Sequence, residues 1–360
     1  MYLVRSILVT FTQLALSATP GTNQKAIGEV VDNLLISRIF ARSDEDLEVK
    51  RYIHDREEDV IMVKQTEAIV LIERQLDGII TPHLEKLRSS GAIPTIRGTI
   101  LTITSQPLRD AQNEYNARVG SDRNNLTFPF RVVCLLVDCR HTIRSSGIGT
   151  VRRKLEEIQR SSFFGTITKS EEFQALWKEI EKLTTSSGGK ENERAANLKA
   201  NNPKLQEVDC ILLEHFNRAS ASGESSKVII FAELRETIRD ILSVIECRRP
   251  LVRPHMFIGQ GLSNKKGGDE AEVRNDMAAQ GMKQKQQREV IKRFRQGDFN
   301  VLVATSIGEE GLDIGEVDLI VNFTTSRSCT RMIQVRVIRL LLRCFDLLLY
   351  RLLIQSKFFS

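Results

Sequence analysis

The part of the chain that most restricts the fold begins near residue 203, where short apolar runs alternate with helical segments. Four runs have the length and composition of buried strands: KVIIFAEL (227–234), HMFIGQ (255–260), FNVLVATS (299–306) and DLIVNF (318–323). Segments with helical periodicity accompany them at 203–216, 235–246 and 283–297. This alternation predicts an α/β fold with a parallel sheet and helical crossovers.

One polar loop follows a predicted strand directly. Residues 301–321 read VLVATSIGEEGLDIGEVDLIV, so small, polar and acidic residues separate two apolar runs. In open parallel sheets, ligands bind beyond the carboxyl ends of the strands. We therefore predict a ligand site at this loop, and the alternative is an ordinary turn.

The first two hundred residues have a different pattern. An apolar strand is predicted at 7–16 and a helix at 25–36, while 43–200 is charged and largely helical in period. A helix is expected at 69–93, bent or restarted at Pro82, and another at 171–184. Polar stretches predict a linker at 186–197 and a loop at 219–226.

Charge favours a polyanionic partner, because the net charge is +6 and the pI is about 9.0. Aromatic residues make up 6% of the chain, which argues against broad base-stacking platforms. The six cysteines form no CxxC pair and lie far from the histidines, so we expect no metal site, no disulfide framework and a reducing compartment.

Neither terminal apolar run predicts a membrane segment. Residues 1–18 imitate a short signal peptide, but Thr10, Thr12 and Gln13 interrupt the run. Arg343, Asp346 and Arg351 interrupt the run 340–354, which we interpret as an amphipathic helix or a stray tail.

Phosphate-binding motifs are scarce. The pattern GxxxxGK[ST] is absent from the sequence. Gly147 and Gly149 open a basic helix in SSGIGTVRRKLEEI, where backbone amides are able to hold a DNA phosphate. The alternative is a plain helix start.

Three blocks resemble motifs of superfamily 2 helicases. Residues 281–321 are similar to motifs IVa and V, KVIIFAELRETIRDIL (227–242) to motif IV, and LALSATPGTNQKAIGEVVDNLLIS (14–37) to motif III and the helix after it. Their order and spacing most closely resemble the Fanconi anaemia group M (FANCM) branch, which includes fungal homologues and archaeal Hef. The resemblance covers about 14–63 and 203–334.

The resemblance implies two RecA-like domains, with the ATP site and the DNA track between them, and a helical insertion that binds branched DNA. Residues 1–63 correspond to the tail of the first RecA-like domain, and 64–200 to the helical insertion and a linker. Residues 201–334 correspond to the second RecA-like domain. We expect 335–360 to be a tail outside the family.

The resemblance also assigns site residues. Three motif III residues couple nucleotide state to domain closure: Ser17, Ala18 and Thr19. Three residues lie on the nucleotide side: Gly311, Asp313 and Gln334. Six residues lie along the nucleic acid: Thr305, Ser306, Lys283, Arg288, Lys292 and Arg293. For the last four, the alternative is a solvated basic helix face.

Two parts of the family's catalytic machinery are missing from the sequence. SATP begins at Ser17, with no phosphate loop or DEAH-type motif before it, and no RxGRxGR pattern follows Gln334. An arginine finger is worth on the order of 10³–10⁵ in rate. The family uses ATP and Mg²⁺, but we expect this chain to bind neither well and to hold no complete catalytic site.

We therefore expect a fragment of an ATP-dependent 3′–5′ DNA helicase or translocase that acts on branched DNA in repair and replication-fork processing. The expected location is the nucleus, and the expected partners are DNA and DNA-repair proteins, without a membrane. The alternatives are a non-catalytic DNA-binding module and a non-functional truncated product. A further hypothesis is that 1–13 and 335–360 are translated intron or out-of-frame sequence.

Overall fold

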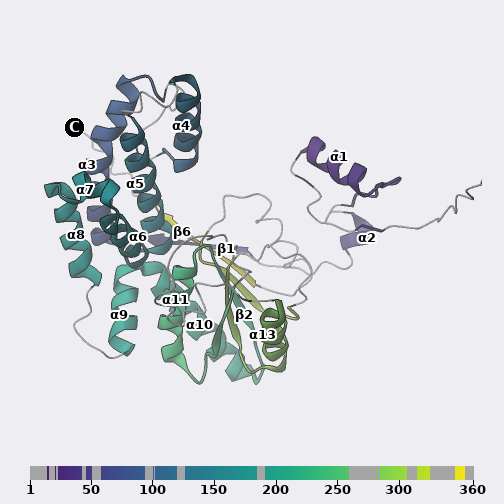
Figure 1. Cartoon of the computed structure of the whole chain (residues 1–360). Helices are drawn as coiled ribbons and strands as arrows, with labels where there is room; N and C mark the ends of the chain where they lie inside the picture. The colour runs from purple at the N-terminus through teal and green to yellow at the C-terminus, as the bar shows by residue number, and fades with distance from the viewer. Residues whose placement is uncertain are drawn as a thin grey trace, which may run out of the picture.

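The structure is a computed structural model, and it describes part of the chain. The described residues are 14–15, 21, 23–42, 46–50, 58–93, 100, 102–119, 126–184, 191–258, 282, 284–305, 314–324 and 345–352. Two connected bodies contain most of them (Figure 1). One is built on a sheet and the other is made of helices.

The sheet confirms the predicted α/β fold. Among the described residues it has six strands in the order β1-β6-β5-β2-β4-β3, and every neighbouring pair is parallel. The strands are β1 (Glu58–Lys64), β2 (Val228–Ala232), β3 (Pro254–Phe257), β4 (Val301–Thr305), β5 (Leu319–Asn322) and β6 (Phe345–Leu352).

Helices on both faces bury the central strands. Alternate residues of β2, such as Val228 and Ile230, belong to one hydrophobic cluster together with residues of α10 (Pro203–Ser222) and α11 (Arg235–Ile245). Ile229 and Phe231 point to the opposite face and pack with α13 (Gln284–Gln296). Burial on both faces explains why the strand sequences are continuously apolar. We call the sheet with α10, α11 and α13 the sheet domain.

The second body, which we call the helical insertion, leaves the sheet domain after β1 and returns at α10. Its core helices are α3 (Glu67–Ser89), α5 (Thr127–Ser146), α6 (Ile148–Arg160) and α8 (Glu171–Thr184). The other elements are α4 (Ser105–Val119), the 3-10 helix η2 (Ser162–Phe164), α7 (Gly165–Thr168) and α9 (Glu191–Asn201). The predicted helix through Pro82 is confirmed, and α3 continues past this proline without restarting.

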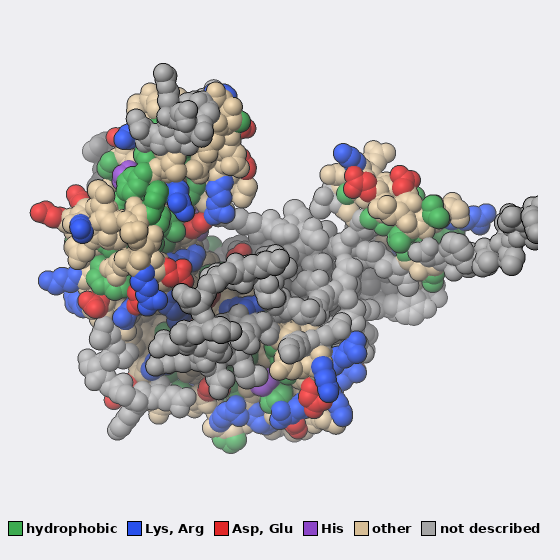
Figure 2. Space-filling model, viewed as in Figure 1, with side chains coloured by type: hydrophobic (Ala, Val, Ile, Leu, Met, Phe, Trp, Pro, Cys, Tyr) green, Lys and Arg blue, Asp and Glu red, His purple; other side chains and the backbone are tan. Residues whose placement is uncertain are grey.

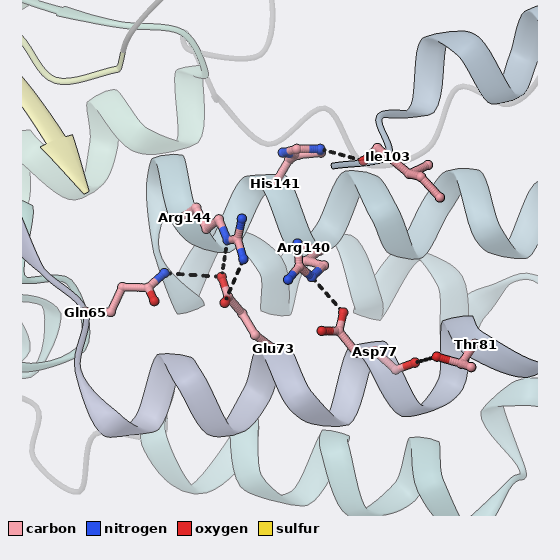
Figure 3. A network of polar contacts seen from close by, with 8 residues as sticks. All are labelled: Gln65, Glu73, Asp77, Thr81, Ile103, Arg140, His141 and Arg144. Carbon is pink, nitrogen blue, oxygen red and sulfur yellow. Dashed lines mark hydrogen bonds and ion pairs between the residues drawn. The ribbon is translucent and has the colours of Figure 1, made fainter. Parts of the chain in front are cut away.

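Buried ion pairs fix α3 against α5 (Figure 3). The Arg144 guanidinium donates two hydrogen bonds to Glu73, at 2.6 and 3.1 Å, and Arg140 donates one to Asp77 at 2.6 Å. Gln65, just before α3, donates to the same Glu73 carboxylate at 3.3 Å. Paired and hydrogen-bonded charges are tolerated in a core, and they select one alignment of the two helices. The segment that leads into the insertion, at Gln65, is therefore bonded to the α3–α5 contact at the centre of its core.

A second set of contacts joins the insertion to the sheet domain. Asp240 of α11 is 4% exposed and accepts a hydrogen bond from Arg153 of α6 at 3.2 Å. A Cβ on Gly149, in the first turn of α6, would lie 3.8 Å from the same carboxylate. Asn202 donates to the Ser146 carbonyl at 2.9 Å and packs against Gly147. Asp240 and Asn202 thus occupy the start of α6, which favours the plain helix start over a phosphate site.

Helix α1 (Gln24–Asn33) confirms the helix predicted after the motif III-like block. Asn23 caps it, because its side chain accepts a hydrogen bond from the Ala26 amide at 2.9 Å. No α1 side chain is buried, and Figure 1 shows α1 and the short α2 (Leu47–Lys50) apart from the sheet. The strand predicted at 7–16 lies outside the described residues apart from Leu14 and Ala15, which are not in a strand.

Three sequence expectations are wrong in detail. The predicted linker is helical from Glu191, because Ala195 is buried and Lys199 pairs with Asp209, contacts that no local pattern reveals. The predicted loop at 219–226 begins later, because α10 continues to Ser222 and Gly223 ends it at a φ of 73°. The C-terminal apolar run contains β6, which pairs with β1 and β5, instead of an amphipathic helix or tail.

None of the described helices combines the length and the low charge that crossing a bilayer requires. The predicted domain boundaries stay predictions. The structure adds that β1, at the end of the segment assigned to the first RecA-like domain, is a strand of the sheet domain.

We expect Asp209→Asn to destabilise the sheet domain by about 2 kcal/mol near neutral pH. This is less than the loss on breaking a fully buried ion pair, because Lys199 and Arg248, the partners of Asp209, are partly exposed. Asp209 accepts hydrogen bonds from Arg248 at 2.8 and 2.6 Å and from Lys199 at 2.9 Å. Burial alone would raise the pKa of Asp209, but these cations lower it below its ordinary 3.8. The stabilisation is therefore present above that value and disappears as the pH falls through the lower, folded pKa. Urea unfolding of Asp209→Asn and of the unchanged chain, at pH values above and below 3.8, tests the expectation. A difference in unfolding free energy that does not change with pH contradicts it.

We expect Gly147→Ala to destabilise the chain more than Gly223→Ala. Both glycines have positive φ, 93° and 73°, so alanine is strained at either position, by about 1–2 kcal/mol. At Gly147 the added Cβ would also lie 2.7 Å from Asn202 Nδ2, whereas at Gly223 it would meet no atom within 4 Å. Urea unfolding should show a further ~1–3 kcal/mol for Gly147→Ala. Equal losses would mean that the Asn202 contact does not hold the junction.

Candidate nucleic-acid interface

The carboxyl ends of β2, β3, β4 and β5 lie along one edge of the sheet domain, because all strands are parallel. Thr305 is the last residue of β4 and stands at this edge. The loop predicted to hold a ligand continues from it through 306–313, outside the described residues. The predicted residues Ser306, Gly311 and Asp313 belong to that loop.

A buried lysine fixes the end of β5 at this edge. Lys204 is 3% exposed, and its ammonium donates a hydrogen bond to the Phe323 carbonyl at 2.8 Å. The same ammonium lies 5.5 Å from the centre of the Phe323 ring. The Phe323 amide donates to the Phe231 carbonyl at 2.9 Å, so the ends of β2 and β5 are locked together.

Lys204 was missed by the sequence analysis. A signal was available, because Lys204 lies in the first turn of α10, where the helix dipole disfavours a cation. Such a position indicates that the charge makes a contact outside its own helix.

A buried glutamine fixes the end of β3. Gln287 of α13 is fully buried, and its amide donates to the Ile258 carbonyl at 3.1 Å. The Ile258 amide donates to the Met282 sulfur at 3.5 Å. The amino-terminal half of α13 therefore lies at the carboxyl edge of the sheet, near the end of β4. The sequence analysis also missed Gln287, because α13 is rich in basic residues and only those were taken as candidates.

The other end of α13 lies at the opposite edge. Arg253 precedes β3 and donates to the Gly297 carbonyl at 3.1 Å, just beyond the end of α13. Arg293 donates to Asp298 at 2.8 Å, and its guanidinium lies 4.6 Å from the centre of the Phe299 ring. The helix therefore runs from the carboxyl edge to the amino edge, and Arg293 is anchored near its far end.

The four predicted basic residues of this helix are not equivalent. Arg288 and Lys292 are exposed and lie on one side of α13, four residues apart. Within the described part of the chain neither makes an ion pair, whereas Arg293 does. Figure 2 shows Lys and Arg side chains gathered over α13. We call Arg288 and Lys292 the basic stripe.

The remaining predicted residues lie outside the described part of the chain: Ser17, Ala18, Thr19, Lys283 and Gln334. Their roles, like those of the loop residues, stay predictions. No group of three or more His, Cys, Asp or Glu side chains among the described residues has a geometry that would hold a metal ion. Among the described residues of the interface, Arg288 and Lys292 offer cations and Thr305 a hydroxyl, which are groups that suit phosphate.

Comparison with known proteins gives a consistent result. Residues 203–339 match the family described as the helicase conserved C-terminal domain, which runs past the predicted boundary at 334. The ATP-dependent DNA helicase mph1 of Aspergillus oryzae is 30% identical over 345 residues, which cover 90% of this chain and 28% of that protein. The ATP-dependent DNA helicase fml1 of Schizosaccharomyces pombe is 32% identical over 335 residues, covering 90% and 37%. The chain thus spans well under half the length of these relatives.

The fold has a solved counterpart. The crystal structure of the Pyrococcus furiosus Hef helicase domain matches with a TM-score of 0.63 at 23% identity, over 93% of this chain and 64% of that one. At this identity the match shows the fold, and it confirms the predicted RecA-like architecture with a helical insertion. Residues 203–339 thus form a helicase conserved C-terminal domain, and the chain as a whole resembles the FANCM-type superfamily 2 DNA helicases, as its similarity to the fungal mph1 and fml1 proteins and to the Hef fold shows.

Proposed function

We propose that the chain is the part of an ATP-dependent 3′–5′ DNA helicase or translocase that holds branched DNA during repair and replication-fork processing in the nucleus. The observation that carries the proposal is the position of the basic stripe. Arg288 lies in the half of α13 that Gln287 fixes at the carboxyl edge, near the end of β4, and Lys292 lies one helical turn further along the same side. The names of the relatives supply the DNA substrate and the ATP dependence.

The proposed contacts are directed to the DNA backbone. Arg288 and Lys292 present cations, and Thr305 presents a small hydroxyl at the end of β4. Groups of this kind bind phosphates and fix the register of a protein on a strand, but they do not read base sequence. Movement along DNA of any sequence requires this type of contact.

We propose that the 360-residue chain alone does not hydrolyse ATP. The family's phosphate loop supplies a lysine for the phosphates and a hydroxyl for Mg²⁺, and the pattern GxxxxGK[ST] does not occur in these residues. The nucleotide-side residues Gly311, Asp313 and Gln334 would then contact ATP only when a separate domain binds its phosphates. DNA-repair proteins remain proposed partners.

A second candidate is a non-catalytic DNA-binding module. It is favoured by the Asp240–Arg153 junction, because side chains of this chain alone join the helical insertion to the domain that carries the basic stripe. A non-functional truncated product fits less well, because separate hydrophobic cores fill the insertion and both faces of the sheet.

We expect Arg288→Gln and Lys292→Gln each to weaken the binding of forked DNA. Each phosphate contact contributes about 0.7–0.9 to the slope of log K against log salt, so the double variant should lower this slope by roughly 1.5. Fluorescence anisotropy between roughly 50 and 200 mM salt measures the slope.

Arg293→Gln is the matched control, because it removes the same charge from the same helix at the end that Asp298 anchors. Its slope should stay close to that of the unchanged chain. An equal fall for all three variants would mean that only the net charge matters and that the basic stripe is not a binding site.

We expect the 360-residue chain to show no DNA-stimulated ATP hydrolysis with forked DNA. A phosphate-release assay measures it, and the Arg288→Gln/Lys292→Gln variant serves as the control. A contaminating ATPase would give the same rate with both proteins. Turnover that forked DNA stimulates and that falls in this variant would contradict the proposal.

A further inference from the structure

A row of aromatic rings lies on the helical insertion, outside the basic stripe. The Phe163 ring of η2 is 5.5 Å from the Phe128 ring of α5 and 5.0 Å from the Phe164 ring, measured between ring centres. The His83 ring of α3 lies 5.9 Å from Phe128 in an edge-to-face arrangement. Three segments distant in sequence thus converge, and their mutual packing holds the rings in place.

Phe163 is the exposed member of this row. It is 38% exposed, and no other aromatic side chain among the described residues of the insertion is classed with it as exposed. Figure 2 shows hydrophobic side chains and a histidine at the surface over α3, α5 and α7. A phenylalanine that is ordered by neighbouring rings but open to solvent offers part of its ring to a ligand.

The surroundings of this ring are cationic. The Arg131 guanidinium lies 4.5 Å from the centre of the Phe163 ring. Arg160 is exposed three residues before Phe163. In the part of the chain that the structure describes, no carboxylate pairs with Arg131 or Arg160. The ring is therefore next to positive charge that is free to meet an anionic backbone.

We propose that Phe163 and Arg131 form a stacking site for one unpaired base of branched DNA. Aromatic rings and guanidinium groups stack on the faces of unpaired bases, and the neighbouring cations attract the phosphate beside the base. Within this row of rings only Phe163 is exposed, and the Arg131 guanidinium lies against it, so the aromatic patch is small and charged for the centre of a protein–protein interface. The proposal rests on the proposed DNA-binding function and gives it a second, base-directed contact.

This division of labour assigns different DNA features to different elements. The basic stripe holds phosphates, which duplex and single strands share. The Phe163–Arg131 site requires a base out of its pair, which a fork or flap supplies and a continuous duplex does not. The chain should therefore prefer DNA with unpaired residues, and this preference should depend on Phe163.

The test compares Phe163→Ala with the unchanged 360-residue chain. The probes are a continuous duplex and a fork that carries 2-aminopurine in its unpaired arm. Loss of one stacked base weakens binding about five- to hundred-fold. We expect this loss on the fork, together with loss of 2-aminopurine quenching, and no change on the duplex. Phe163→Trp should keep both the affinity and the quenching.

Two further variants sharpen the result. Arg131→Lys keeps the charge but removes the planar group, so it should reduce quenching and leave the salt slope unchanged. Arg288→Gln should weaken fork and duplex binding alike and leave the quenching of bound fork unchanged. Equal melting temperatures for the variants and the unchanged chain exclude a folding defect. If Phe163→Ala lowers the melting temperature, Phe163→Leu is measured in its place.

Each outcome decides between the proposals. If the chain binds DNA in a salt-dependent way and Phe163→Ala binds the fork equally well, the stacking site is wrong. The proposed DNA-binding function then stands. Absence of any DNA binding by the unchanged chain overturns both. Unchanged DNA binding with a loss of self-association in sedimentation would show that Phe163 contacts protein, which also overturns the stacking site.

Discussion

The buried carboxylate of Asp240 is the contact on which the arrangement of the two bodies depends. It belongs to a helix packed on the sheet, yet it lies at the start of α6 and pairs with Arg153 in the helical insertion. Burial raises the pKa of Asp240, and the Arg153 guanidinium opposes that rise. A helix amino terminus also favours a nearby negative charge. The ionised carboxylate therefore has its partners only while the insertion is docked on the sheet domain.

This docking fixes the position of the basic stripe relative to the Phe163–Arg131 site. The basic stripe is anchored through Gln287 to the end of β3, and the Phe163–Arg131 site is anchored through the core of the insertion. Since Asn202 and Asp240 join the two bodies, both sites would meet a bound DNA from one frame. A fork places its duplex and its unpaired arms at a set spacing, so a rigid frame suits such a substrate better than a continuous strand.

The sequence predicted the centre of the sheet well, because strands buried on both faces are continuous apolar runs that need no knowledge of their neighbours. It failed where the cause is tertiary. The polar stretch containing Glu191 becomes helical through contacts such as that of Lys199 with Asp209, and the run containing Phe345 becomes a strand by pairing with β1 and β5. Of the residues at the candidate interface, charge alone indicated Arg288, whereas Lys204 and Gln287 bond to backbone carbonyls that only the fold brings near them.

The order of the strands explains how the insertion is attached. β1 precedes the insertion in sequence and β2 follows it, yet both are strands of the same sheet. The chain therefore leaves the sheet domain at Gln65, which contacts Glu73 inside the insertion, and returns at Asn202, which contacts Ser146. The insertion is therefore held by its two chain connections and by the contacts of Asn202 and Asp240, which both lie at the start of α6. A displacement of the insertion would consequently be transmitted to the sheet domain directly, rather than through a flexible linker.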